Sequence, residues 1–430
     1  MKHRNTVTSS LLFALIFMLQ NLISGACLLA YAAPHERVLY SFCSEQNCLD
    51  GSLPTVPLIS DAQGNLYGTT SEGGSGFLGL GTVFELSLDP DHSWTRTVLY
   101  NFCPVLPCTD GESPTFGALT IDAGGNLYGT TNSGGLYGLG VVFELSPTGN
   151  GTWSEKVLHS FNDVAGDGGH PWGGLLFDQA GNLFGTGNVG GTYGFGVVFE
   201  LSPNGDGTWG ESILYSFQPF PDAHYPSSPV VMDKHGRLFG TAGWGGDDNY
   251  GAIFVLAQKN GQWAERVLHS FSNDGTDGYH PQTELVLDEA GNIYGTTPSG
   301  GIYGGGIVFA FSVKNGQAVE NILHNFNPQT DGFDPQGGMI LNASKKALYG
   351  TTAYGLASGC DCGTVYQLTR NQNGQWQERI IYTFNGGSVD GEFPQAGLLF
   401  DNAGNLYGTT SFGGGGFGGM GGGTAFEITP

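Results

Sequence analysis

The chain has 430 residues with 75 glycines and 20 prolines, and 39% of its residues are hydrophobic. A collagen-like Gly-X-Y period is absent, and apolar residues are too frequent for a disordered chain. The formal charge of -24 excludes nucleic acid as a partner and disfavours an anionic membrane surface, because both are bound through Lys and Arg. Many short strands joined by glycine-containing turns fit this composition best.

Residues 1–33 are predicted to be a signal peptide. Lys2 and Arg4 precede two apolar stretches, 11–19 and 22–29, and Ala30-Tyr31-Ala32 forms a cleavage site of the A-x-A type. The alternative is an uncleaved anchor, but two polar residues interrupt the apolar run and favour cleavage. We therefore expect an exported protein (secreted, at the cell surface or periplasmic) with no stable membrane insertion once the leader is removed.

Six cysteines follow the leader and form three close pairs. An even number of cysteines in an exported chain indicates disulfide bonds. The predicted bonds are Cys43–Cys48, Cys103–Cys108 and Cys360–Cys362. Metal binding is the weaker alternative for these pairs, because they lie in different repeats.

A segment of the form Leu-Tyr-Gly-Thr-Thr occurs seven times, at a spacing of about 57 residues. The copies begin at Leu66, Leu127, Leu183, Leu238, Ile293, Leu348 and Leu406. An apolar run and a turn of the D-x-x-G-N type precede the segment, and two further apolar segments follow it. Each repeat therefore supplies four short strands, and four strands per repeat with a recurring aromatic motif predict a β-propeller.

The two ends of the chain predict how the ring closes. Residues 38–42 form a fourth strand without the preceding three, whereas residues 398–429 supply a first, second and third strand without a fourth. The N-terminal strand can complete the last blade, which leaves no open edge to aggregate. We therefore expect an all-β fold in which residues 34–430 form a single seven-bladed propeller domain with four antiparallel strands per blade.

The repeated strands also carry a family resemblance. The G-N-L-Y-G-T-T segment at 64–70 and the G-T-V-F-E-L segment at 81–86 resemble the GloVer tandem repeat, which occurs in exported bacterial proteins. The resemblance covers residues 38–430. It implies export and a propeller-like repeat, and it implies no particular activity.

Functional residues are expected where the repeats differ from one another. In the third, fourth and fifth copies, the loop from a fourth strand to the next first strand places histidine beside its proline. This loop and the loop from the second to the third strand are expected to share the face over the channel mouth. The candidate ligand-binding residues there are His170, Trp172, His224, Tyr225, Trp244, Asp247, Asp248 and His280.

Three interpretations of this cluster remain open. Exposed Trp with Asp suits sugar binding through stacking and hydrogen bonds. Imidazoles with carboxylates suit a transition metal. In the third interpretation these are ordinary loop residues whose histidines bond to local carbonyl groups.

Other titratable residues are expected to matter less. His159, His269 and His324 alternate with Tyr at one position of the fourth strand, which predicts packing on the outer strand. The loop carboxylates Glu112, Asp334 and Glu392 are near the expected mouth. A glycosidase needs two carboxyl groups at a defined separation, and the sequence does not give the distance between any two of these residues.

No P-loop, G-x-S-x-G or H-E-x-x-H motif occurs. We therefore favour a non-catalytic exported binding module, expected as a monomer without a cofactor, that recognises a glycan or an extracellular protein through its loop-rich face. A divalent metal ion is the alternative cofactor. The alternative functions are a secreted carbohydrate-active or lactone-acting enzyme with its site at the channel mouth, and a structural surface protein.

Overall fold

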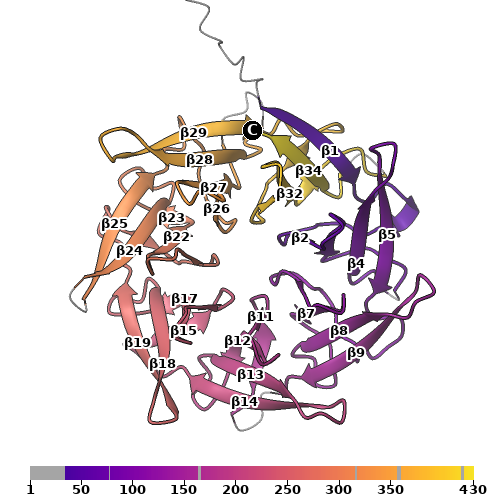
Figure 1. Ribbon diagram of the computed structural model, residues 1–430, viewed down its shortest axis with the longest axis horizontal. Coiled ribbons are helices and arrows are strands. Elements are labelled where there is room, and N and C mark those ends of the chain that lie inside the picture. Colours follow the sequence, from indigo (N-terminus) through magenta and orange to yellow (C-terminus); the bar gives the residue numbers. More distant parts are fainter. Residues whose placement is uncertain (1–33, 77, 163–165, 315–316, 356–359, 418–420) are drawn as a thin grey trace, which may run out of the picture.

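The computed structural model describes residues 34–76, 78–162, 166–314, 317–355, 360–417 and 421–430. These residues form seven antiparallel sheets that stand as blades around a central channel (Figure 1). In each blade the four strands follow one another from the central channel to the outer edge of the propeller, as the repeat predicts. The seven-bladed propeller is thus confirmed, and the leader assigned to residues 1–33 lies outside the described residues.

The strands occupy equivalent positions in the seven blades. The first strands are β2 (Ile59–Ser60), β6 (Thr120–Ile121), β11 (Leu176–Phe177), β16 (Val231–Met232), β21 (Val286–Leu287), β26 (Ile340–Leu341) and β31 (Leu399–Phe400). The second strands are β3 (Leu66–Thr70), β7 (Leu127–Thr131), β12 (Leu183–Gly190), β17 (Leu238–Gly245), β22 (Ile293–Thr297), β27 (Ala347–Thr352) and β32 (Leu406–Thr410).

The third and fourth strands complete the blades. The third strands are β4 (Thr82–Leu88), β8 (Val141–Pro147), β13 (Val197–Pro203), β18 (Ala252–Lys259), β24 (Ile307–Lys314), β28 (Thr364–Arg370) and β34 (Thr424–Thr429). The fourth strands are β5 (Trp94–Asn101), β9 (Trp153–Ser160), β14 (Trp209–Ser216), β19 (Gln262–Ser270), β25 (Gln317–Asn325), β29 (Trp376–Thr383) and β1 (His35–Ser41). A 3-10 turn, η1 (Gln46–Cys48), follows β1.

The first and last strands of the chain meet in one blade. β1 runs antiparallel to β34, with His35 opposite Thr429 and Val38 opposite Phe426. On the channel side, the hydroxyl of Thr409 donates to the carbonyl of Val56 in the first blade, 3.2 Å away. β1 is therefore the outer strand of the seventh blade.

An equivalent threonine hydroxyl joins each blade to the next around the channel. The other six bonds run from Thr69 to the carbonyl of Pro114, Thr130 to Gly173, Thr186 to Ser228, Thr241 to Thr283, Thr296 to Pro335, and Thr351 to Ala396. Buried carbonyl groups need such donors. The repeated threonine therefore has a structural role at every blade junction.

Hydrophobic clusters also form across the junctions. In one of them, Tyr67 and Val83 of the first blade pack against Leu127 and Phe143 of the second. Equivalent clusters join the other neighbouring blades. Each blade thus buries its apolar faces against its neighbours, which is the main favourable contribution to folding.

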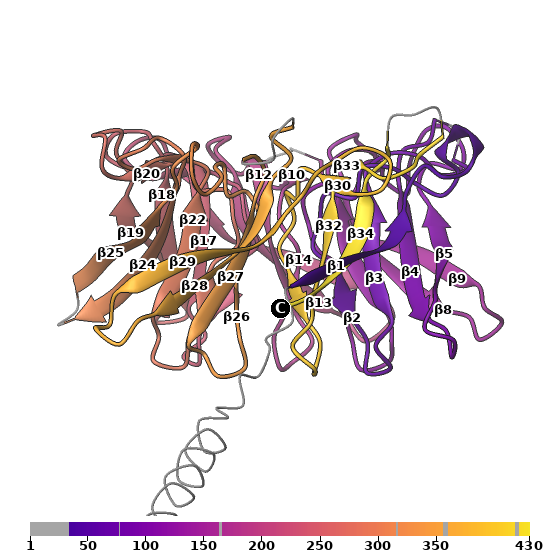
Figure 2. The same ribbon diagram turned by 90° about the horizontal axis from the view of Figure 1, so that it is seen from above.

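The loop-rich face lies at one end of the ring (Figure 2). Here short strands in the fourth-to-first loops pair with extensions of the second strands: β10 (Gly168–Pro171) with β12, β15 (Ala223–Pro226) with β17, β20 (Gly278–Tyr279) with β23 (Ser299–Gly300), and β30 (Gly391–Glu392) with β33 (Phe412–Gly413). In the other blades isolated bridges join the same loops. The two sets of loops therefore lie side by side, as predicted.

Three disulfides join the predicted cysteines, Cys43–Cys48, Cys103–Cys108 and Cys360–Cys362. The first two close equivalent loops after β1 and β5. Within the described ranges, no helix combines the length and the apolar character that crossing a membrane requires.

Candidate functional site

One loop position per blade combines a fixed backbone with a variable side chain. It precedes the loop proline and has φ between 48° and 60° at Leu53, Ser113, His170, Tyr225, His280, Asp334 and Phe393. At each position the backbone N–H donates to a carbonyl in the second-to-third loop of the preceding blade. The backbone is thus held in the same way in all seven blades while the side chain changes, an arrangement suited to recognition.

The residues after these prolines line a cavity in the central channel. Its volume is about 210 Å³, and all seven blades contribute to its wall. Three amides (Gln282, Gln336 and Gln395) and three hydroxyls (Thr55, Thr115 and Ser227) supply hydrogen-bonding groups. The volume is below the roughly 300 to 1,000 Å³ of drug-sized pockets, so the cavity suits a single small polar ring or the end of a chain.

An aromatic pair forms part of the same wall. The rings of Phe116 and Trp172 stack with their centroids 3.9 Å apart and their planes 13° apart. Trp172 directly follows the loop proline Pro171, and Phe116 belongs to a loop that is one residue longer than its counterparts. Phe116 remains 39% exposed, so this pair offers an apolar surface to a ligand in the channel.

A single carboxylate stands among these neutral groups. Glu284 is the only acidic residue among the described residues that line the cavity. Its side chain is exposed to the channel. Partial desolvation by the surrounding blades raises the pKa of Glu284 to about 7. The other six repeats carry Pro57, Ala118, Gly174, Pro229, Gly338 and Gly397 at this position.

Hydrogen bonds between blades orient two of the channel amides. Ser411 donates to Gln395 Oε1 (2.7 Å), and Gln395 Nε2 donates to Gln336 Oε1 (3.1 Å). Gln336 Nε2 in turn donates to Asp334 Oδ2 (2.8 Å). Burial raises the pKa of Asp334 to about 6. The chain of bonds presents both amides to the channel in fixed orientations, which favours specific recognition of a polar ligand.

The histidines of the predicted cluster bind to neighbouring blades rather than to one another. His170 Nδ1 lies 2.8 Å from the carbonyl oxygen of Asn132, and His280 Nδ1 lies 2.6 Å from that of Gly243. His224 is buried, and its ring stacks on Phe195 with a centroid distance of 4.4 Å. Burial lowers the pKa of His224 and so favours the neutral form of this ring.

The other predicted residues form a rim outside the channel cavity. Trp244 lies opposite His224 in the β15–β17 pair, is 47% exposed, and has its ring centroid 4.3 Å from that of His280. Tyr225 packs against Phe195. Asp247 and Asp248 are exposed in the next loop. Trp172 alone of the predicted residues lines the channel cavity.

The sequence reasoning missed two features. Glu284 was not singled out, although a charged residue where the other repeats have proline, alanine or glycine was a usable signal. His159, His269 and His324 pack on the outer strand as predicted, each in T-shaped contact with a phenylalanine ring. Each ring nitrogen Nε2 also faces a carboxylate, those of Asp167, Asp277 and Asp331. The contacts with these carboxylates became apparent only in the tertiary structure, because the alternation of His with Tyr at this position indicates packing alone.

The solved structures to which the chain is similar share little of its sequence. They include a protein of Bacteroides uniformis ATCC 8492 named as a candidate 6-phosphogluconolactonase (14% identity, 75% of this chain and 83% of the other covered, TM-score 0.48). Others are a protein of Lactobacillus plantarum (15%, 76% and 84%, 0.49) and a protein of unknown function from Dyadobacter fermentans DSM 18053 (10%, 93% and 100%, 0.46). At these values the similarity says nothing about activity.

The sequence comparisons assign the chain to a family. No curated protein matches it. Residues 29–228 and 227–430 each match the Gloeobacter/Verrucomicrobia repeat, in agreement with the resemblance carried by the repeated strands. Because the two matches together cover all of the described residues, the chain belongs to the Gloeobacter/Verrucomicrobia repeat family.

Proposed function

We propose that this protein is a non-catalytic binding module that recognises a glycan, through a terminal sugar held in the central channel. The observation that carries the proposal is the stacked Phe116–Trp172 pair beside channel amides and hydroxyls. Sugars present apolar ring faces and polar edges, so they match aromatic surfaces with nearby hydrogen-bonding groups. The three disulfides are compatible with work in an oxidising compartment outside the cytoplasm.

The number of carboxylates favours recognition over hydrolysis. Most glycosidases use two carboxyl groups about 5 to 10 Å apart. Among the described residues of the cavity wall, Glu284 is the one carboxylate. We therefore assign Glu284 a role in hydrogen bonding to a ligand hydroxyl.

Trp172 and Trp244 can be compared by glycan-array binding and by calorimetry. Trp172→Ala removes half of the stacked pair in the channel, and we expect binding to weaken at least tenfold, which is about 1.4 kcal/mol. Trp244→Ala changes the rim outside the cavity and is the matched control, so its affinity should stay close to that of the unchanged protein.

Two results would contradict the proposal. If Trp244→Ala abolishes binding while Trp172→Ala does not, the site is the rim and not the channel. If the unchanged protein binds no glycan, sugar recognition is wrong. Release of reducing ends from a bound glycan, abolished by Glu284→Gln, would instead support the carbohydrate-active enzyme.

A further inference from the structure

A three-residue cluster recurs at the junctions between blades. A Tyr or His of one fourth strand meets an Asp from the loop that follows it and a Glu from the fourth strand of the next blade. The clusters are Tyr100–Asp110–Glu155, His159–Asp167–Glu211, Tyr215–Asp222–Glu265, His269–Asp277–Glu320, His324–Asp331–Glu378 and Tyr382–Asp390–Glu36. At the seventh junction Arg96 takes the place of the Glu beside Tyr40 and Asp50.

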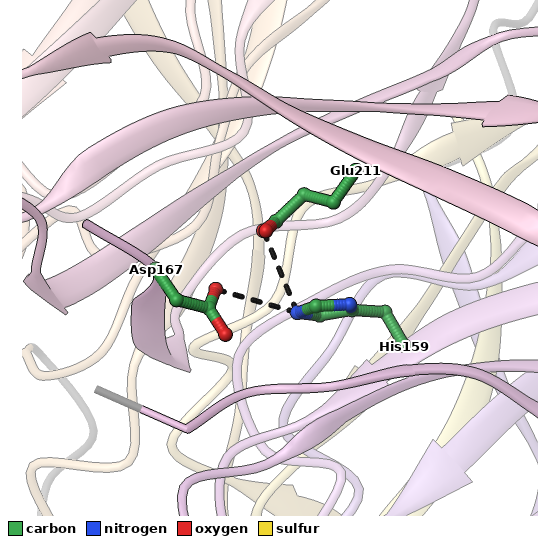
Figure 3. A group of neighbouring side chains, drawn as sticks. All are labelled: His159, Asp167 and Glu211. Atoms are coloured by element: carbon green, nitrogen blue, oxygen red, sulfur yellow. Dashed lines mark hydrogen bonds and ion pairs between the residues drawn. The ribbon is translucent and has the colours of Figure 1, made fainter. Parts of the chain in front are cut away.

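The cluster between the second and third blades has the geometry of a metal site. His159 Nε2 lies 3.3 Å from Asp167 Oδ1 and 3.5 Å from Glu211 Oε1 (Figure 3). One ligand atom from each residue lies within 4.8 Å of the others. With zinc–ligand distances of about 2.0 to 2.1 Å, neighbouring ligands of a tetrahedral ion are roughly 3.3 to 3.4 Å apart, so His159 lies at coordination spacing from both carboxylates.

The cluster between the fourth and fifth blades repeats this arrangement. His269 Nε2 lies 3.1 Å from Asp277 Oδ2 and 3.8 Å from Glu320 Oε2, and this group meets the same 4.8 Å limit. In both clusters a neutral imidazole and two carboxylates would carry two negative charges. A divalent cation matches that charge, and imidazole with carboxylate is a ligand set that zinc accepts.

At the first cluster, a buried carboxylate oxygen and a surface cavity agree with this geometry. Glu211 Oε1, the oxygen that faces His159, is buried and has no hydrogen-bond partner, whereas in the second cluster Glu320 Oε1 is unpartnered and Oε2 faces His269. The glutamates of the other four clusters also have a buried Oε1 without a partner, so the spacing of the ligand atoms is what distinguishes the two proposed sites. A buried acceptor without a partner is costly. A cavity of about 640 Å³ at the surface is lined by His159, Asp167 and Glu211, and it gives an ion a route to the first cluster.

The remaining histidine cluster differs in a way that provides a control. His324 Nε2 makes a direct contact of 2.7 Å with Asp331 Oδ2. Among the described residues, the groups whose ligand atoms lie within 4.8 Å of one another are those of His159 and His269. At the tyrosine junctions a phenol takes the place of the imidazole, as where Tyr215 donates to Asp222 (2.8 Å).

We propose that His159–Asp167–Glu211 and His269–Asp277–Glu320 each bind a divalent transition metal ion, Zn²⁺ being the probe of choice, and that each ion links two blades. The role of the metal is structural. It is independent of the ligand in the central channel, because the residues that would hold the metal lie on the outer strands and in the loops that follow them, and none of them lines the channel cavity.

The test uses the full chain, stripped of metal with a chelator and titrated with Zn²⁺. We expect two ions per chain, one after His159→Tyr or His269→Tyr, and none after both. Tyrosine stands at this position in four other blades, so these variants should fold, and circular dichroism would verify it. His324→Tyr is the matched control and should still bind two ions.

A second readout separates binding at these sites from binding elsewhere. Zn²⁺ should raise the melting temperature of the unchanged protein and of His324→Tyr but not that of the double variant, because only binding to the folded state stabilises it. Glu211→Gln should remove one ion without changing the imidazole. The proposal is overturned if the unchanged protein binds no Zn²⁺, or if the double variant keeps both the ions and the thermal shift.

Discussion

The turn between the first and second strands is held by one aspartate side chain. Asp61 Oδ1 accepts bonds from the backbone N–H groups of Gln63 and Asn65, and Oδ2 accepts one from Asn65 Nδ2. These short-range bonds explain why the D-x-x-G-N pattern recurs. At the same scale, glycine recurs in the second strand because the aromatic residue of the third strand lies directly over it: a Cβ atom at Gly240 would be 2.5 Å from Phe254 Cζ.

We predict that Gly240→Ala destabilises the protein by about 1 to 3 kcal/mol, the usual cost of overpacking a core. Gly243→Ala, in the same strand β17, is the control, because its Cβ would meet no atom closer than 3.6 Å. Chemical denaturation of both variants measures the difference. Equal stability of the two variants would show that the Phe254 ring moves aside without cost.

At the scale of the elements, the fourth strands bring acidic residues together. Burial, and then the neighbouring aspartate, raise the pKa of Glu155 and Glu36 to about 7 and that of Glu265 to about 8. These three residues lie at tyrosine junctions. The folded protein therefore holds protons that the unfolded chain releases near pH 4.5, and linkage makes its stability depend on pH.

The sign of this dependence follows from the raised pKa values. The contribution of these protonated carboxyl groups to the stability of the folded protein is complete below about pH 4.5 and is lost as the pH rises through 7 to 8. We therefore predict a lower free energy of unfolding at pH 8.5 than at pH 5. Replacing Glu36, Glu155 and Glu265 by Gln, which resembles the protonated acid, should make the protein more stable than the unchanged protein at pH 8.5 and flatten the profile.

Urea denaturation across this pH range, with a chelator present to exclude metal effects, measures both profiles. The control is Glu72→Gln, which changes an exposed glutamate and should leave the profile unchanged. If the stability of the triple variant and of the unchanged protein falls equally with pH, the pH dependence does not come from these three glutamates.

At the scale of the whole molecule, β1 joins the beginning of the chain to its end. Leu39 and Phe42 belong to the hydrophobic cluster that also contains Tyr407 and Leu58. β1 therefore covers the edge of β34, and Leu39 within it and Phe42 directly after it supply core residues to the junction between the last and first blades.

We predict that deleting residues 35–41 lowers the melting temperature and causes the protein to associate, because β34 then becomes an uncovered edge strand. Size-exclusion chromatography with light scattering would show the larger species. A chain that begins at residue 34 is the control and should keep the size and the melting temperature of the complete domain. If the deletion variant matches this control, β1 is not needed to close the ring.

The sequence by itself determined the architecture, because each blade is specified by short-range signals. Gly68 and the threonines recur once per repeat, Asp61 recurs in all repeats but the sixth, which has Asn342, and the unpaired strands at the two ends indicated seven blades. The cysteine pairs were also apparent, since each lies within one loop.

Only the tertiary structure decided which residues form sites. It divided the predicted cluster into Trp172 in the channel and Trp244 on the rim, and it brought Glu284 together with amides from other blades. It also brought Glu211 to His159, which lies in the preceding repeat. These residues are far apart in the chain and meet because neighbouring blades pack face to face around a common axis. The sequence pattern within one repeat does not show which residues of two blades come into contact.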